Sequence, residues 1–296
     1  MKFIRFTVYV GTSFLIVLII GVYIWHISRP PTKLELFVFD TKGKPSIFIR
    51  TPEDTRILIN GGANSGVIRY ITNALPFYSR RIDTVIVTSD EGDCVSGLVD
   101  VISRYKIGQV IVPAITSKKF GFSSSTDQIY ETFLRTVDSL RVPKKEVLIG
   151  DQLNFGKLSG DILFPEMVDK FKYSKSSPPE LVIKFTYGQI SFLLLGDMGT
   201  KGQRYLIDAG KSVDALRSNF LIFSHSISAT TLSSGLINAV KPEFVVYSQS
   251  LSSGSSGRDK AKADPLYSIL DSHRLNIKQK STIEVLSDGE SVEILR

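Results

Sequence analysis

Histidine and cysteine are scarce in this sequence of 296 residues. There is one cysteine, Cys94, and the three histidines are His26, His225 and His273. A single cysteine excludes an internal disulfide and a cysteine-rich zinc module. Three histidines exclude a dinuclear metallohydrolase centre of the usual kind, because such a centre uses about five imidazoles among its ligands.

Strong charge of either sign is also lacking. Lys and Arg number 36 and Asp and Glu number 29, which leaves a formal net charge of +7. Such an excess permits contact with phosphates or anionic lipid without requiring it. Hydrophobic residues make up 43% and charged residues 22% of the chain, which excludes a disordered or collagen-like protein.

One long hydrophobic run is present. Residues 6–25 (FTVYVGTSFLIVLIIGVYIW) carry no charge, and at about 1.5 Å per residue they span the ~30 Å hydrocarbon layer of a membrane. We therefore predict a single-pass transmembrane anchor within residues 1–33. The charges that flank the run favour a cytoplasmic N-terminus and an extracytoplasmic C-terminal part. A cleaved signal peptide and a buried core helix remain as alternatives, although no small-x-small pair follows the run.

Residues 34–296 are predicted to form one domain. Residues 34–40, 45–50 and 56–62 have the pattern of three strands, and residues 180–197 that of a hairpin turning at residues 187–189. Strand–helix units stand between these segments and after them. Two mixed sheets packed face to face, with helices on both outer sides, would bury every apolar face. The predicted fold class is thus α/β with two mixed sheets, and a single doubly wound sheet is the alternative.

Polar groups follow three of the predicted buried strands. Residues 83–89 lead into an acidic loop, Asp197 follows residues 192–196, and His225 follows residues 220–224. Each feature alone is typical of a helix cap or a hydrogen-bonded core residue. Because strand ends of one sheet can converge where α/β folds place their sites, the three together predict one pocket.

Several segments carry a family resemblance. They are LELFVFDTKGKPSIFIRTPEDTRILINGG, IDTVIVTSDEGDCVSGL, LVIKFTYGQISFLLLGD, LIFSHSISATT and KPEFVVYSQS. Together they resemble the metallo-β-lactamase-fold domain at the C-terminus of ComEC-type DNA-uptake (competence) proteins, over nearly all of residues 34–296. The resemblance implies a four-layer αββα sandwich, in agreement with the two mixed sheets predicted above.

The resemblance also shows which ligands are missing. Where the family has an HxHxDH loop, Ser89, Glu91 and Cys94 replace the three histidines and only Asp93 persists. The acidic-glycine turn of the family is altered at residues 40–45 (DTKGKP), and the acid before its Gly-Gly pair becomes Asn60. The first of the family's two metal positions is therefore expected to be empty.

The second metal position retains more residues that could act as ligands. By the resemblance its ligands would be two carboxylates, a thiolate and an imidazole, from Asp93, Cys94, Asp197 and His225. Such a set suits one zinc ion, and four protein ligands leave no open position for catalysis. Because an erased site also leaves polar remnants, we expect no cofactor, with one zinc ion as the alternative.

The predicted function follows from these losses. We expect a membrane-anchored, non-catalytic binding or scaffold module that acts in DNA uptake or an envelope process, with an unknown protein partner. The alternative is a divergent one-metal hydrolase acting on phosphodiesters, in which Glu91 and Asp197 would be catalytic. An envelope enzyme with another pocket is a third hypothesis, for which the sequence offers no constellation of residues.

One basic cluster is a candidate phosphate contact. Arg258, Lys260 and Lys262 follow the Ser/Gly-rich stretch that begins at residue 250. They predict weak, sequence-independent binding of nucleic acid that fades with salt.

Overall fold

The computed structural model describes residues 13–23, 31–41, 44–76, 78–116, 127–173, 179–208, 213–223, 232–248, 274–277 and 281–295. Four predicted site residues lie outside these ranges: His225, Arg258, Lys260 and Lys262.

The first sheet is mixed. Within the described residues it has eight strands in the order β15-β14-β1-β2-β3-β4-β5-β6. The strands are β1 (Leu34–Phe39), β2 (Ser46–Arg50), β3 (Arg56–Ile59), β4 (Arg81–Ile86), β5 (Lys106–Pro113), β6 (Lys144–Val147), β14 (Thr282–Ser287) and β15 (Val292–Leu295). Neighbours from β15 to β3 pair antiparallel, and those from β3 to β6 pair parallel.

The second sheet is mixed as well. Its order within the described residues is β13-β12-β11-β10-β9-β8-β7. The strands are β7 (Gln152–Phe155), β8 (Leu158–Phe164), β9 (Val182–Tyr187), β10 (Ile190–Gly196), β11 (Phe220–Phe223), β12 (Phe244–Tyr247) and β13 (Arg274–Asn276). Strands β7 to β10 form antiparallel hairpins, and β10 to β13 run parallel. The predicted hairpin is confirmed, because Tyr187 pairs with Ile190 across the turn.

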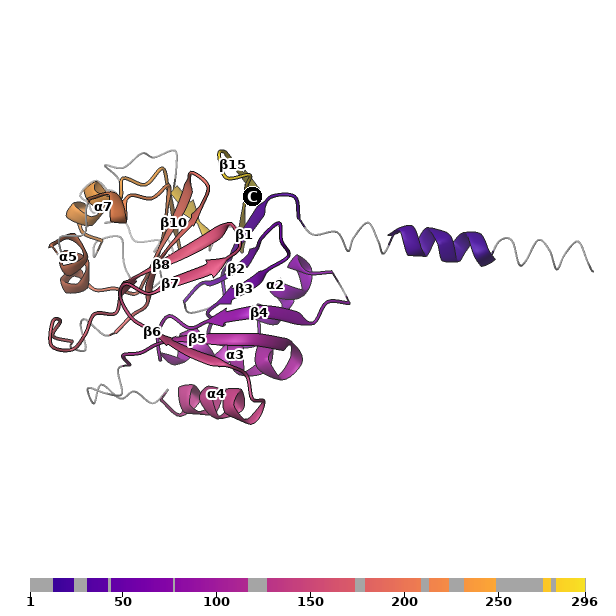
Figure 1. The fold of residues 1–296 in the computed structure, drawn as a ribbon, viewed down its shortest axis with the longest axis horizontal. Coiled ribbons are helices and arrows are strands. Elements are labelled where there is room, and N and C mark those ends of the chain that lie inside the picture. The colour runs from indigo at the N-terminus through magenta and orange to yellow at the C-terminus, as the bar shows by residue number, and fades with distance from the viewer. Residues whose placement is uncertain are drawn as a thin grey trace, which may run out of the picture.

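Helices cover both outer faces (Figure 1). The helices are α2 (Val67–Ala74), α3 (Gly92–Arg104), α4 (Asp127–Ser139), α5 (Thr200–Asp208), α6 (Val213–Leu216) and α7 (Ser234–Val240). Helices α2, α3 and α4 pack on the first sheet, whereas α5 and α7 pack on the second. The predicted αββα sandwich is confirmed, and the single doubly wound sheet is wrong because the hairpins β7–β10 belong to a second sheet.

Side-chain alternation creates separate cores. In β1, Leu36 points into the core between the sheets, whereas Phe39 points into the core beneath α2 and α3. Strand β10 is buried along nearly its whole length, because Phe192 meets the first sheet and Leu193 meets the helices of the other side. Each such large apolar side chain contributes about 1.5–3 kcal/mol when it is buried.

The predicted membrane anchor is described only in its middle. Residues 13–23 are helical, and apolar side chains such as Phe14 (71% exposed) and Val17 (67%) make no packed core there. Residues 6–12 and 24–25 of the predicted span lie outside the described ranges. Over the part of the chain that the structure covers, no helix has both the length and the hydropathy needed to cross a membrane. The anchor thus stays a prediction.

Glycines let helix α3 approach the first sheet closely. The Gly97 amide donates to the Gly62 carbonyl at 3.1 Å, and the Gly61 amide donates to the Cys94 carbonyl at 2.6 Å. A Cβ on Gly97 would overlap the Gly61 carbonyl. The loop after β3 and the start of α3 are therefore locked together by backbone contacts.

Replacing Gly97 by alanine is expected to lower the free energy of unfolding by about 1–3 kcal/mol, because backbone atoms must move to admit the methyl group. Urea denaturation measures the change. The matched control is Gly235→Ala in α7, where the nearest atom to a new Cβ is Ile207 Cδ1 at 3.4 Å. This control should gain about 0.5–1 kcal/mol from helix propensity. A similar gain in both variants would contradict the close approach at α3.

Candidate functional site

The predicted site residues lie at one end of the sandwich. Glu91, Asp93 and Cys94 begin helix α3 after strand β4, and Asp197 directly follows β10. The two sheets meet at this end, because the Leu181 amide donates to the Thr88 carbonyl at 2.7 Å. Electrostatic interactions link Asp93 to both Glu91 and Asp197. The structure thus brings together all of the predicted metal-site residues that it describes.

A lysine that the sequence interpretation did not assign to the site lies at its centre. The Lys44 ammonium lies 2.9 Å from Glu180 Oε2 and 3.1 Å from Glu91 Oε2. The side chains of Lys44 and Glu180 are 2% and 0% exposed, whereas that of Glu91 is 39% exposed. One cation thus joins a fully buried carboxyl group to one that reaches solvent.

Local structure holds Lys44 in place. The Thr41 hydroxyl donates to the Lys44 carbonyl at 3.0 Å and also contacts Ser46 Oγ at 3.1 Å. Gly62 has a left-handed backbone with φ of 71°, and a Cβ there would overlap Thr41. Thr41 is therefore held against the Gly-Gly pair, and Pro45 leads directly into β2.

The charge of Lys44 is set by its surroundings. Burial alone would lower the pKa of Lys44. Four neighbouring groups raise it: Cys94, Glu180, Glu91 and Asp197. The net result is a pKa well above the ordinary value, so Lys44 carries a full positive charge at neutral pH.

Cys94 contributes a buried thiol to the site. It is fully buried, and its Sγ lies 3.9 Å from Thr88 Oγ1. Burial raises the pKa of the Cys94 thiol well above its ordinary value, although Lys44 acts to lower it. Without a metal ion the thiol is neutral at neutral pH. The negative charge around Lys44 therefore comes from the carboxylates.

Glu180 is a buried carboxyl group that holds a proton. Burial raises the pKa of Glu180 to about 8, although the Lys44 ammonium acts to lower it. Oε2 accepts a hydrogen bond from Lys44, and Oε1 is buried with no hydrogen-bond partner among the described residues. Oε1 lies against Gly196, where a Cβ would overlap the carboxyl group.

Two further family positions have local structural roles. The Asn60 amide group donates to Thr88 Oγ1 at 2.9 Å and accepts from the Thr88 amide at 3.0 Å, so it joins the ends of β3 and β4. Ser89 is fully buried, and its Oγ accepts a hydrogen bond from the Glu91 amide at 3.3 Å. Both side chains stabilise the loop after β4.

Little open space adjoins Lys44. A cavity of about 20 Å³ is lined by residues from both sheets: Lys44, Pro45, Ile47, Ile59, Asn60, Thr88, Leu194, Gly196, Ile222 and Phe223. Such a volume holds about one water molecule. Among these lining residues there is no room for a substrate beside the ammonium.

The described residues do not fit the predicted zinc ion. Among them, no group of three or more His, Cys, Asp or Glu side chains could hold a metal ion. A divalent cation beside Asp93 or Asp197 would also be repelled by the Lys44 ammonium, which interacts with both carboxylates. Asp93 Oδ1 favours a ligand, because it is buried and has no hydrogen-bond partner within the described ranges. The four-ligand set itself stays a prediction, because His225 lies outside the described residues.

Lys44 and Glu180 were missed for different reasons. Lys44 is visible in the sequence as a basic residue in a turn where the related family is acidic, and this reversal of charge was a usable signal. Glu180 follows Pro178 and Pro179 just before β9 and belongs to no quoted motif. Nothing in its local sequence indicates burial.

Comparisons with known proteins support the architecture. No protein-family model and no curated protein sequence matches this chain. Among solved structures it is similar to a diphosphatase from the PhnP family, with 12% identity and a TM-score of 0.51, over 86% of this chain and 98% of that one. An identity this low shows the fold alone.

Two further examples of similar structures have TM-scores below 0.5. They are CmlA, a diiron β-hydroxylase from Streptomyces venezuelae (15% identity, TM-score 0.46, 81% of this chain and 47% of that chain), and a metallo-β-lactamase from Cronobacter sakazakii (15%, 0.45, 74% and 93%). The chain spans about half the length of CmlA. The ComEC-type assignment stays a prediction. What is shown is the αββα sandwich, a fold that this chain shares with the diphosphatase.

Proposed function

We propose that this chain is a non-catalytic protein of the metallo-β-lactamase fold, which acts as a binding or scaffold module. The observation that supports the proposal is the Lys44 ammonium between Glu180 and Glu91 at 2.9 and 3.1 Å. We infer that this ammonium replaces the catalytic cations of the ancestral site. An ammonium supplies positive charge to the carboxylates, but it has no open coordination position at which a water could be activated.

Lys44 does not substitute for a metal in catalysis. Its raised pKa keeps it protonated at neutral pH, so it cannot act as a general base there. The small cavity beside it also leaves no space for a substrate among the lining residues. The charge therefore stabilises the fold at the former site.

The place of action is part of the same proposal. We propose that residues 6–25 anchor the chain in the cell membrane and that the domain lies outside the cytoplasm, in a DNA-uptake or envelope process as in ComEC-type proteins. The uncharged run and the exposed apolar side chains of residues 13–23 support the anchor. A protein of the envelope would then be the natural partner of the scaffold.

A second candidate function has one specific observation in its favour. Asp93 Oδ1 is buried without a partner among the described residues, and Asp93 interacts electrostatically with Asp197. These two carboxylates could serve a divergent one-metal hydrolase of phosphodiesters, in which His225 would be a further ligand. Lys44 would then have to leave the site.

Metal analysis separates the two functions. The purified full chain is expected to contain no stoichiometric zinc or manganese, to melt at the same temperature with EDTA or added Zn²⁺, and to hydrolyse no phosphodiester with either metal. In Lys44→Ala, the vacated carboxylates should bind a divalent ion, so added Zn²⁺ or Mn²⁺ should raise the melting temperature.

The control for this test is Lys33→Ala, which removes an exposed lysine that pairs with Glu293 at 3.6 Å. It should show no response to metal. Stoichiometric metal in the wild-type chain, with turnover that is lost in Asp93→Asn and Asp197→Asn, would instead establish the one-metal hydrolase.

A further inference from the structure

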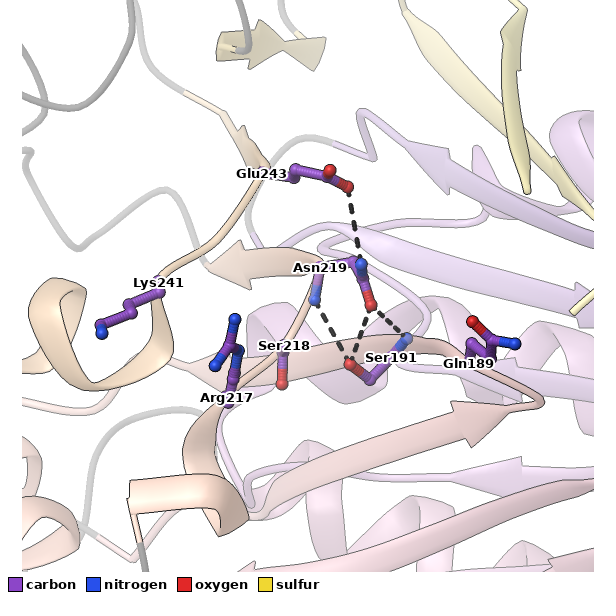
Figure 2. A pocket seen from close by; sticks show the side chains of 7 residues that line it. All are labelled: Gln189, Ser191, Arg217, Ser218, Asn219, Lys241 and Glu243. Carbon is purple, nitrogen blue, oxygen red and sulfur yellow. Dashed lines mark hydrogen bonds between the residues drawn. The ribbon is translucent and has the colours of Figure 1, made fainter. Parts of the chain in front are cut away.

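A polar pocket lies at the end of the second sheet opposite to Lys44. It has a volume of about 350 Å³ and is formed where strands β10, β11 and β12 begin (Figure 2). Its lining comes from residues 189 and 191, residues 217–219, Lys241 and Glu243. Small-molecule sites have volumes of roughly 300–1,000 Å³, so a compact ligand fits.

The floor of the pocket is rigid. The amide and the hydroxyl of Ser191 donate to Asn219 Oδ1 at 3.0 and 3.1 Å, and the Asn219 amide donates back to Ser191 Oγ at 3.3 Å (Figure 2). The Asn219 carbonyl accepts the amides of Glu243 and Phe244, each at 2.9 Å. The start of three neighbouring strands is thus held by one asparagine, and little ordering is needed when a ligand binds.

Two basic residues of the pocket have no partner in the part of the chain that the structure describes. Among the described residues, the side chains of Arg217 and Lys241 make neither an ion pair nor a hydrogen bond, and both residues are exposed. The single carboxylate of the lining, Glu243, is approached by Asn219 Nδ2 at 3.5 Å. In Figure 2 the Arg217 side chain stands between Lys241 and Asn219. The lining therefore has an excess of positive charge that an anion could neutralise.

The backbone at Lys241 gives independent support. Lys241 ends helix α7 with φ of 48° and ψ of 55°, which is the left-handed conformation. Glycine is the favoured residue at such a helix end, because a Cβ is sterically disfavoured there. A lysine stands at this position despite that preference, and it is one of the residues that line the pocket. A residue held in a disfavoured conformation beside a pocket points to a role for its side chain.

We propose that this pocket binds the phosphate group of a small organic molecule. The planar Arg217 guanidinium can donate two parallel hydrogen bonds to a phosphate, and Lys241 adds a second positive charge. A phosphate monoester carries a charge of about −1.5 to −2 at neutral pH, which two cations match. The exposed Gln189 amide lies in the same lining and would contact the organic part. This inference does not depend on the proposed role of Lys44 between Glu180 and Glu91.

The test is isothermal titration of the full chain in detergent, at low ionic strength, with inorganic phosphate and with adenosine monophosphate as probes. Both should bind, and added salt should weaken them. Arg217→Gln should weaken both by roughly tenfold, the value expected for loss of a charge-assisted pair. Lys241→Gly should also weaken both, yet it should raise the melting temperature because glycine tolerates the left-handed backbone. If Lys241 had only a structural role, its replacement would not weaken binding while it raises the melting temperature.

The matched control is Arg204→Gln, because Arg204 is a basic residue of α5 that lines a different cavity. It should bind both probes as the wild type does. Absence of binding in the wild type, or equal binding in Arg217→Gln, would overturn the proposal. Binding of a single-stranded oligonucleotide that depends on Arg217 and Lys241, without binding of either small probe, would also overturn it and assign the pocket to a polymer.

Discussion

Replacing Lys44 by methionine is expected to lower the free energy of unfolding by about 3 kcal/mol at neutral pH. The change leaves the buried Glu180 carboxyl without its hydrogen-bond donor, which costs about 1–3 kcal/mol. The upper end applies here, because the lost donor is charged and Glu91 loses its cation as well. Methionine keeps the length and apolar character of the aliphatic part of lysine. The decrease in the free energy of unfolding therefore measures the contribution of the ammonium group. Urea denaturation followed by circular dichroism measures it.

The control for Lys44→Met is Lys33→Met. The Lys33–Glu293 pair is 3.6 Å long and its side chains are 41% and 57% exposed, so its loss should change stability by about 0–1 kcal/mol. The double variant Lys44→Met with Glu180→Leu should recover part of the loss, because no buried polar group is then left without its partner. A cost for Lys44→Met as small as that for Lys33→Met would refute the central role of the ammonium.

The free energy of unfolding is expected to fall by a few kcal/mol as the pH rises from about 4.5 to about 8, owing to Glu180. Burial raises the folded-state pKa of Glu180 to about 8, whereas the ordinary value is 4.5. Between these values the unfolded chain loses the proton and the folded chain keeps it. The unfolded state thus binds fewer protons, so stability decreases with pH in this window.

Lys44 does not contribute to the pH dependence of stability between pH 4.5 and 8. Its folded-state pKa is raised, so its contribution is fully present below the ordinary value of 10.5 and is lost only above it. Asp93 and Glu35 also have raised pKa values, with burial as the main cause, and they contribute slopes of the same sign. The effect of Glu180 is therefore the difference between the wild type and Glu180→Gln. Urea denaturation across the pH range gives both curves.

A suitable control is Glu293→Gln, because Glu293 is an exposed acid. It should keep the slope of the wild type, whereas Glu180→Gln should be flatter. Parallel curves for the wild type and Glu180→Gln would show that Glu180 is ionised in the folded state, contrary to its burial beside Gly196.

Much of the fold was predictable because its signals are local. The alternation in β1 and the hairpin of β9 and β10 are each contained within a few residues, and the strand–helix alternation requires helices on two outer faces. The replacement of the expected metal-binding histidines is also visible within a short segment of the sequence. Ser89, Glu91 and Cys94 stand in one loop, and their identities alone remove the imidazoles of a dinuclear centre.

The partners of these residues could not be predicted in the same way. Lys44 and Glu180 are 136 positions apart, and they precede strands of different sheets, β2 and β9. Neither stands in a periodic pattern, and a lysine in a polar turn is ordinarily exposed. Arg217 and Lys241 likewise meet at one pocket only because β11 and β12 lie side by side.

The sequence by itself determined the sandwich of two sheets, the missing imidazoles and the long apolar run, since each depends on residue identity or on short-range order. Only the tertiary structure decided what stands beside the predicted metal position. Burial makes charge energetically costly unless a partner is adjacent, and adjacency across the sandwich is a property of the packed chain. Packing placed the Lys44 ammonium between Glu180 and Glu91, where it also interacts with Asp93, Cys94 and Asp197 of the predicted ligand set.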